Sequence, residues 1–321
     1  MVRSEVPLVD LTPWYSGTPD GRRAVAGQVD RALREVGFLL VSGHRVPAGL
    51  AAALRAEALA FFALPEQVKA AYAVRVGGRG FLPLGAEANG GAYGLDTPPD
   101  LKESFTMGRS PGPDRPGYEH WYRPNVWPAE RPALRELGSA YMRACRELAD
   151  DLLEICAVAL GLAPDFFVSR CDHTPYSLNL NWYPPIERVG QPAEGQFRIG
   201  PHTDFGTLTV LDRQPGLGGL QVRALDGEWT DAPYVPGALT INTGDLLARW
   251  TGDRWRSTPH RVLPPDPRAP AEELVSLVFF YEANPWAVVE TLPGEAAGPV
   301  RYPPVTGGEY LRSRLDAITV G

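Results

Sequence analysis

The sequence is poor in cysteine, and its apolar residues never gather into a long run. The three cysteines, Cys145, Cys156 and Cys171, are odd in number and lack the paired spacing of zinc ligands. This argues against a disulfide framework and predicts reduced, buried thiols in a cytoplasmic protein. No apolar stretch approaches the roughly 20 residues that a membrane-spanning helix needs. The N-terminal segment MVRSEVPLVDLTPW also lacks the apolar core of a signal peptide.

The chain has no excess of basic residues either. Its 31 lysines and arginines stand against 38 aspartates and glutamates, which gives a net charge of −7. Because nucleic acids and anionic membranes attract basic surfaces, neither is expected as a partner. The composition is otherwise that of a globular protein, and 321 residues allow one large domain or two modest ones. We expect a small-molecule substrate and a monomer or small homo-oligomer.

The first half of the chain carries helical patterns between short strands. Strand patterns occupy residues 6–10 and 37–42, and helical patterns occupy 20–36, 47–73 and 129–160. Residues 77–120, with Gly-Gly, Pro-Pro and Pro-Gly-Pro signals, are expected to be mostly loop. One apolar stripe of the longest helical pattern is expected to pack against a sheet: Leu134, Leu137, Tyr141, Cys145, Leu148, Leu152, Ile155 and Ala159.

From about residue 176 the pattern changes to short strands separated by turn residues. These strand patterns lie at 177–183, 206–211, 219–223, 238–242, 257–263 and 274–281. A run of strands after a run of helices predicts an α+β protein with an antiparallel β core and a helical flank. A double-sheet jelly roll or a barrel would remove the exposed edges of such strands. Residues 306–317 are expected to form a closing helix.

The chemically most informative pattern is a His-x-Asp pair, His202 and Asp204, followed much later by His260. Alone, such a pair is more often an ordinary polar contact than a metal site. In a strand, however, residues i and i+2 point to the same face, so His202 and Asp204 can bind one metal together. His260 lies in another expected strand. Two imidazoles and a carboxylate on one face of an octahedron are typical of non-haem iron oxygenases, because dioxygen and substrate can use the remaining positions.

Longer segments around these residues carry a family resemblance. The segment GPHTDFGTLTVLDRQPGLGGLQV (200–222) resembles the metal-binding block of the 2-oxoglutarate/iron(II)-dependent oxygenases related to isopenicillin N synthase. The segment PGALTINTGDLLARWTGDRWRSTPHRV (236–262) resembles their second block, which includes the distal histidine. Further matching segments are NLNWYPP (179–185), VPLVDL (6–11), GFLLVSGH (37–44), FFALPEQVK (61–69) and LKESF (101–105).

This resemblance implies a double-stranded β-helix (jelly-roll) core with a helical N-terminal region and a C-terminal helix. It divides the chain into a mixed N-terminal region (1–175), a catalytic core with the iron site (176–290) and a C-terminal extension packed on the core (291–321). It implies iron(II) held by His202, Asp204 and His260. The implied activity is the hydroxylation, desaturation or cyclisation of a small-molecule metabolite with dioxygen, using 2-oxoglutarate as cosubstrate.

The resemblance also assigns residues to the cosubstrate. Tyr183 and Asn181 match the tyrosine and asparagine that hold 2-oxoglutarate in the family, and Ser276 matches the serine of its Arg-x-Ser motif. The arginine of that motif, which meets the far carboxylate of 2-oxoglutarate, is replaced by Leu274. A leucine cannot supply the always-charged, two-pronged guanidinium that suits a carboxylate.

Three explanations for Leu274 stay open. Another arginine can take over, for which Arg198 and Arg268 are the candidates. The chain can instead use another carboxylate-bearing cosubstrate, or none, as a 2-oxoglutarate-independent iron oxidase of the same fold. It can also have lost its activity, against which the intact His-Asp-His set argues.

The substrate is expected between the N-terminal region and the mouth of the barrel. Candidate substrate residues are Arg79, Phe81, Phe105, Asn179 and Tyr281. For each aromatic residue, core packing is an equally reasonable role. The flanking glycines would let Arg79 reach a substrate carboxylate. The segment 118–127 is expected to be a lid or a packed loop.

Two readings outside the oxygenases use the same residues. A cupin-like isomerase or binding protein can share a metal-binding jelly roll, since a fold does not fix a function. A zinc hydrolase can also use three protein ligands of these types with one water. Oxygen uptake by the iron-loaded protein separates both of these from an oxygenase.

Overall fold

The computed structural model describes residues 5–94, 97–112, 115–217 and 219–318. The α-helices of this part of the chain are α1 (Thr12–Tyr15), α2 (Pro19–Glu35), α3 (Ala48–Phe62), α4 (Glu66–Ala70), α5 (Ala133–Ala159), α6 (Ile186–Val189), α7 (Asp245–Trp250) and α8 (Gly307–Ile318). The strands are β1 (Leu8–Asp10), β2 (Phe38–Ser42), β3 (Gly80–Leu82), β4 (Glu103–Gly108), β5 (Ser177–Tyr183), β6 (Ile199–His202), β7 (Leu208–Asp212), β8 (Leu220–Arg223), β9 (Trp229–Asp231), β10 (Leu239–Thr243), β11 (His260–Val262), β12 (Leu274–Tyr281), β13 (Val288–Val289) and β14 (Val305–Thr306).

Two sheets form the core of the molecule. The larger sheet has the strand order β1-β2-β10-β7-β12-β5-β4-β3, and the smaller sheet has the order β6-β11-β8-β9. The successive strands β5 to β12 are shared between the two sheets, as in a jelly roll. The expected fold class is therefore confirmed. Strands β1 to β4, from the N-terminal half, extend the larger sheet on both of its sides.

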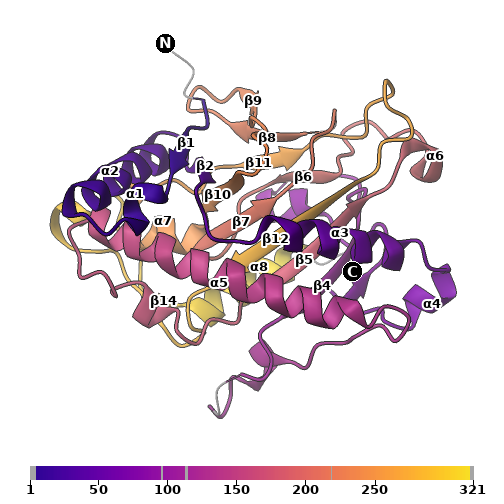
Figure 1. Ribbon diagram of the computed structural model, residues 1–321, viewed down its shortest axis with the longest axis horizontal. Helices are drawn as coiled ribbons and strands as arrows, with labels where there is room; N and C mark the ends of the chain where they lie inside the picture. The colour runs from indigo at the N-terminus through magenta and orange to yellow at the C-terminus, as the bar shows by residue number, and fades with distance from the viewer. Residues whose placement is uncertain (1–4, 95–96, 113–114, 218, 319–321) are drawn as a thin grey trace.

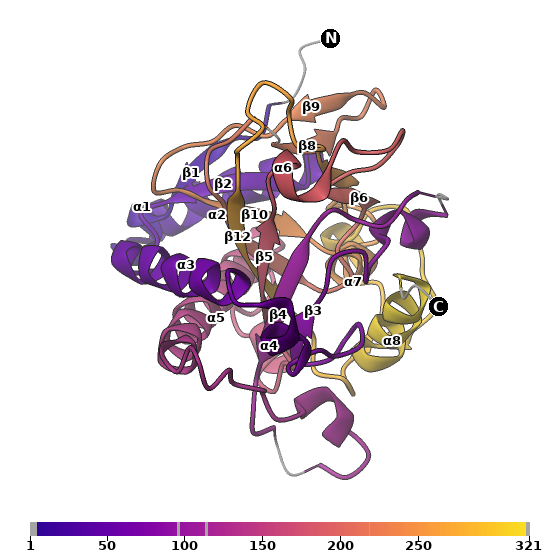
Figure 2. The same ribbon diagram turned by 90° about the vertical axis from the view of Figure 1, so that its right-hand side faces the viewer.

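Helices cover the larger sheet on its outer face. In Figure 1 the long helix α5 crosses in front of the sheet beside α2 and α3. Figure 2 shows α3 and α5 on one side of this sheet and α8 on the other. The apolar stripe expected on residues 129–160 faces the sheet, since Leu134, Tyr141 and Leu148 are buried in the main core cluster. Helix α5 starts only at Ala133, directly after Pro132, because proline favours the first turn of a helix.

The structure corrects the sequence-based expectation at several elements. Residues 77–120, expected to be mostly loop, contain β3 and β4. Every residue of β4 is buried, and the strand pairs along its whole length with β5. This tertiary pairing forms a strand in a segment whose glycines and prolines indicate loop. The single helical stretch expected at 47–73 is broken at Pro65 into α3 and α4, and β6, β9 and α7 were not expected.

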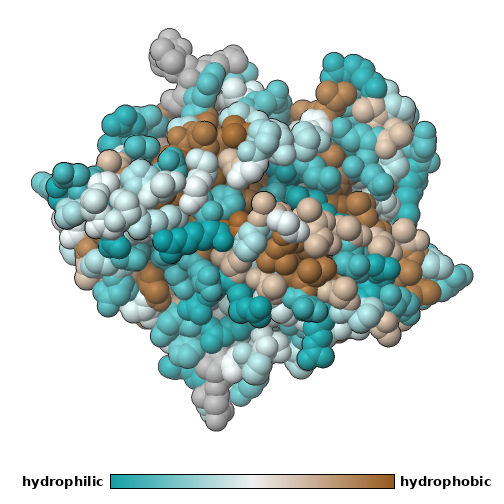
Figure 3. All heavy atoms as spheres, viewed as in Figure 1, coloured by the Kyte–Doolittle hydropathy of each residue, from teal (hydrophilic) through white to brown (hydrophobic). Residues whose placement is uncertain are grey.

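The surface is mixed in hydropathy. On the face drawn in Figure 3, apolar side chains gather over α3 and hydrophilic side chains dominate elsewhere. Within the described ranges, no helix is both long and apolar enough to cross a membrane. The three cysteines are free and buried, as expected from their number and spacing.

Two of the candidate substrate residues, Phe81 and Phe105, belong to the core. Phe105 is fully buried on β4, and its ring packs edge-on against Phe61 of α3 with 4.8 Å between the ring centroids. Phe81 on β3 also packs edge-on against Phe61, at 5.8 Å. These aromatic rings join the helical layer to the larger sheet.

Replacing Phe105 should therefore affect stability and not substrate binding. We expect Phe105→Ala to lower the free energy of unfolding by about 3–5 kcal/mol, because it removes a buried aromatic ring and leaves a cavity. Urea unfolding followed by circular dichroism measures this loss. The control is Leu225→Ala, since Leu225 is 72% exposed and its truncation should change stability little. A stable Phe105→Ala variant with a raised KM would contradict the assignment to the core.

Candidate metal centre and its two pockets

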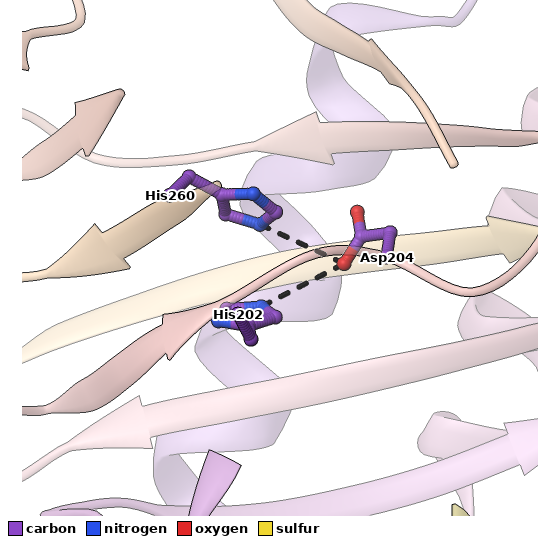
Figure 4. Close-up of side chains that lie close together, drawn as sticks. All are labelled: His202, Asp204 and His260. Carbon is purple, nitrogen blue, oxygen red and sulfur yellow. Dashed lines mark ion pairs between the residues drawn. The ribbon is translucent and has the colours of Figure 1, made fainter. Parts of the chain in front are cut away.

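His202, Asp204 and His260 lie together between the two sheets. His202 is the last residue of β6, Asp204 lies two residues after it, and His260 is the first residue of β11. The register places His260 directly opposite His202 across the β6–β11 pair. Each Nε2 lies 3.6 Å from Oδ1 of Asp204, and the possible ligand atoms all lie within 4.8 Å of one another. Figure 4 shows both imidazoles turned toward the carboxylate.

Both imidazoles are held in the tautomer that a metal requires. Nδ1 of His202 lies 2.8 Å from the carbonyl oxygen of Gly200, and Nδ1 of His260 lies 3.1 Å from that of Thr258. A carbonyl only accepts, so each Nδ1 carries the proton and each Nε2 keeps its lone pair for a metal. Burial, followed by the charge of the neighbouring His202, lowers the pKa of His260 to about 4, against the opposing effect of Asp204. His260 is therefore neutral at pH 7.

Asp204 is held by its other oxygen. Oδ2 accepts hydrogen bonds from Thr209 Oγ1 at 2.5 Å and from Asn242 Nδ2 at 2.7 Å, so Oδ1 is the oxygen that faces the two imidazoles. Burial opposes ionisation of Asp204, but the facing imidazoles and these two hydrogen bonds hold its pKa below the ordinary value. Two imidazole nitrogens and one carboxylate oxygen grouped around one point fit iron(II).

Two pockets meet at this site. The smaller pocket reaches from His202, Asp204 and His260 along the inner face of the larger sheet, where Asn181, Tyr183, Leu274 and Ser276 line it. The larger pocket shares His202 and Asp204 with the smaller one and extends to loop residues of the N-terminal half. From the segment 118–127, it is lined by His120, Trp121 and Arg123. This places the expected lid or packed loop at the wall of a pocket.

The residues matched to the family's cosubstrate contacts come together in the smaller pocket. Ser276 stands opposite Asn181 and Leu274 stands opposite Tyr183 in the β5–β12 ladder. Oδ1 of Asn181 accepts a hydrogen bond from Ser104 Oγ at 2.9 Å, which fixes the amide. Burial raises the pKa of Tyr183, although the charge of Lys102 and hydrogen bonds from Ser276 and Asn181 oppose this. Tyr183 is therefore a neutral hydroxyl.

The two arginines considered as substitutes at Leu274 do not line the smaller pocket. Arg198 is fully buried, and its Nη1 lies 3.2 Å from Oε1 of Glu272. Its guanidinium sits over the ring of Tyr183, and Arg198 is not among the residues that line the smaller pocket. Arg268 is largely exposed and pairs with Asp266 two residues before it.

Of the candidate substrate residues, Arg79 and Asn179 line the larger pocket. Arg79 donates to the carbonyl oxygens of Met107 at 3.1 Å and Pro175 at 3.4 Å. Burial, and then the charge of Arg123, lowers the pKa of Arg79 to about 10. The carboxamide oxygen of Asn179 is buried and has no hydrogen-bond partner among the described residues. Tyr281, by contrast, lines neither pocket, because its hydroxyl turns to Asp150 on α5.

Glu282, which belongs to no recognisable sequence motif, also lines the larger pocket. The residue is buried, and its Oε2 has no hydrogen-bond partner among the described residues. Gly206 gives it room, because a Cβ at that position would lie 2.2 Å from this oxygen. Burial, and then the charge of Asp204, raises the pKa of Glu282 to about 8. A buried, unpartnered carboxyl beside a metal site suggests that a ligand supplies its partner.

The hydrogen bond from Asn242 should matter for metal affinity. We expect Asn242→Ala to weaken iron(II) binding by about 10–100-fold, since groups that orient a ligating carboxylate typically contribute this much. Anaerobic competition against a coloured chelator measures this affinity. Asn125→Ala is the matched control, because Asn125 makes two hydrogen bonds to the backbone of Gly108 and lines neither pocket. Equal affinity in both variants would show that Asn242 does not position Asp204.

Two family models match the chain. The model for the N-terminal part of non-haem dioxygenases in morphine synthesis matches residues 6–130, and the 2OG-Fe(II) oxygenase superfamily model matches residues 174–283. Among similar solved structures, a 2OG-Fe(II) oxygenase family protein of Caulobacter crescentus has a TM-score of 0.83 and 32% identity over 98% of this chain and 99% of that chain. A full-length Neurospora crassa protein in complex with alpha-KG and thymine has a TM-score of 0.82 and 28% identity over 97% and 96%.

Curated proteins similar to this chain are also oxygenases. The validamycin A dioxygenase of Streptomyces hygroscopicus subsp. limoneus is 43% identical over 98% of this chain and 87% of its own length. A homoarginine-6-hydroxylase of Glycine max is 31% identical over 97% of this chain and 96% of its own length. Similarity of this extent, together with the grouping of two imidazoles and a carboxylate, shows that this chain belongs to the 2OG-Fe(II) oxygenase superfamily and is an iron(II)- and 2-oxoglutarate-dependent dioxygenase that acts on a small molecule.

Proposed function

We propose that His202, Asp204 and His260 bind the iron(II) and that the two pockets divide the remaining ligands between them. 2-Oxoglutarate occupies the smaller pocket against Tyr183 and Ser276, and substrate occupies the larger one. When bound, the iron supplies the activation of dioxygen, with conversion of 2-oxoglutarate to succinate and carbon dioxide and oxidation of a substrate C–H bond. The register of the β6–β11 and β5–β12 pairs supports this division.

The protein contributes position and exclusion of water. The carbonyl oxygens of Gly200 and Thr258 hold the two imidazoles, and Thr209 and Asn242 hold Asp204. Because these partners belong to the protein itself, binding of a metal needs little reorganisation of the ligands. The burial of all three side chains keeps bulk water from the reacting atoms.

We also propose that the substrate is a small polar molecule with a cationic nitrogen. The observation that carries this proposal is the unpartnered, buried Oε2 of Glu282 in the wall of the larger pocket. A cation beside it would restore its charge and satisfy the oxygen. The free carboxamide oxygen of Asn179 offers a second acceptor for N–H or O–H groups of the same molecule.

Two of the cationic side chains that line this pocket, Lys102 and Arg79, already have partners. Lys102 is paired with Glu87, and Arg79 donates to two backbone carbonyls. Because a guanidinium has five N–H donors, Arg79 can still bind oxygen atoms of a substrate. The relatives are named for molecules as different as validamycin A and homoarginine. These names alone do not select a substrate for this chain, so the proposal depends on the residues of the pocket.

We also draw proposals on the partner, the compartment and the oligomeric state of the enzyme from its charge, its cysteines and its pockets. The net charge of −7 supports a free small molecule and not a nucleic acid as the substrate. The three reduced, buried cysteines support a cytoplasmic protein. We propose a monomer or a small homo-oligomer, since residues of one chain line both pockets.

Loss of the carboxylate should end turnover. We expect Asp204→Ala to abolish oxygen uptake by the iron-replete protein, because the variant loses the charged ligand of the metal. An oxygen electrode and succinate release measure this. Asp231→Ala is the control, since Asp231 is exposed on β9 and should tolerate the change. Near-native oxygen uptake and succinate release by the Asp204 variant would refute the assignment of the site.

The charge of Glu282 should set the substrate preference. Small amines and guanidines are compared with their uncharged N-acetyl or ureido counterparts, and succinate release above the substrate-free level is measured. The native enzyme should respond at least tenfold more strongly to the charged members, and Glu282→Gln should lose most of this preference. Charged and neutral counterparts with equal effects on the native enzyme would rule out the proposed substrate class.

A further inference from the structure

The smaller pocket lacks the arginine that the family uses at the position of Leu274. Leu274 lines this pocket next to Tyr183 and Ser276, and it offers only methyl groups to a carboxylate. Placing the far carboxylate of 2-oxoglutarate there without a cation would leave a charge unpaired in a largely dry pocket. Neither Arg198, which pairs with Glu272, nor the exposed Arg268 lines the pocket.

Arg213 does line this pocket. It directly follows β7, whose Asp212 pairs with Leu277 of β12. Continued by one residue, this register would place Arg213 opposite Ser276, with both side chains on the same face. Alternate residues of these strands confirm which face this is, because they all line the smaller pocket: Thr209, Leu211 and Arg213 on and after β7, and Leu274, Ser276, Val278 and Phe280 on β12.

The guanidinium of Arg213 is held in place but not neutralised. Its Nη2 donates to the carbonyl oxygen of Ala232 at 2.8 Å and also to that of Pro233. Its Nε is buried and has no hydrogen-bond partner, and no carboxylate of the described residues lies within salt-bridge distance. Burial holds the pKa of Arg213 below its ordinary value, as expected for a cation that lacks an anionic partner. The guanidinium of Arg213 can therefore donate hydrogen bonds to the carboxylate of a ligand.

We propose that Arg213 binds the far carboxylate of 2-oxoglutarate and replaces the arginine that is missing at Leu274. The residue reaches the same end of the pocket from β7, the neighbour of β12 on the side away from β5. A planar guanidinium with an unused Nε can form a charge-assisted pair with a carboxylate. This inference rests on the use of 2-oxoglutarate by the enzyme, which is a property of its family.

The test compares two 2-oxo acids. 2-Oxoglutarate carries the far carboxylate, whereas 2-oxobutyrate has the same metal-chelating end without it. The full-length protein is loaded with iron(II) under anaerobic conditions and titrated with each acid, and the weak visible metal-to-ligand band is followed. We expect Arg213→Met to weaken 2-oxoglutarate binding by about 10–100-fold, the size of one charge-assisted pair, and to leave 2-oxobutyrate binding within about twofold.

A second variant separates charge from structure. Arg213→Gln keeps an N–H donor on a shorter side chain but carries no charge, so it should show the same selective loss. Arg268→Met is the matched control, since Arg268 is exposed and paired with Asp266, and it should bind both acids as the native protein does. The affinities of the two Arg213 variants for the two acids are the decisive measurement, because the visible band reports binding without turnover.

Two results would overturn the inference. Equal weakening of both acids in the Arg213 variants would show a structural role, and unchanged 2-oxoglutarate affinity would show no role. Binding of the two acids to the native protein distinguishes failure of this inference from failure of the proposed function. If the native iron-loaded protein bound 2-oxobutyrate and 2-oxoglutarate equally well, then no residue would recognise the far carboxylate, and Arg213 would be excluded with it. If it bound neither acid, the proposed function itself would fail.

Discussion

The structure depends on one arrangement, in which two imidazoles are locked by hydrogen bonds to the backbone just before them. Nδ1 of His202 bonds to Gly200 and Nδ1 of His260 bonds to Thr258, each two residues earlier. The same local device, repeated on β6 and β11, aims both lone pairs at Asp204. It works only because the smaller sheet places these strands side by side with the two histidines in register. The jelly roll therefore supplies both the position of the two imidazoles and the ring nitrogen that each presents to a metal.

Much of this could be predicted from the sequence. Strands β5 and β12 begin and end where the alternating patterns place them, at Ser177–Tyr183 and Leu274–Tyr281. The alternation of side chains along β12 also explains why Tyr281, a candidate substrate residue, lines neither pocket. Ser276, Val278 and Phe280 face the pocket, so Tyr281 must face the opposite way, toward α5. A shift of one residue in a strand exchanges its two faces.

The rest depends on pairings between distant segments. Strand β4 forms because it lies between β3 and β5, although its surroundings resemble loop. Arg213 and Glu282 carry no recognisable motif. Their importance appears only when β7 lies beside β12 and when the space above Gly206 leaves room for a carboxyl group. The local sequence predicts the strands from their periodicity, but it does not predict which side chains of different strands lie close together in the barrel.

The two proposed contacts divide the site by charge. Arg213, a cation without an anionic partner among the described residues, lines the smaller pocket, and the carboxyl of Glu282 lines the larger pocket. A dianion such as 2-oxoglutarate is attracted by Arg213, whereas a cationic substrate is repelled by Arg213 and stabilises the ionised form of Glu282. The charges therefore select the position of each ligand as well as its affinity. Moving the guanidinium from β12 to the end of β7 keeps this separation, since Leu274 and Arg213 both line the smaller pocket whereas Glu282 lines the larger one.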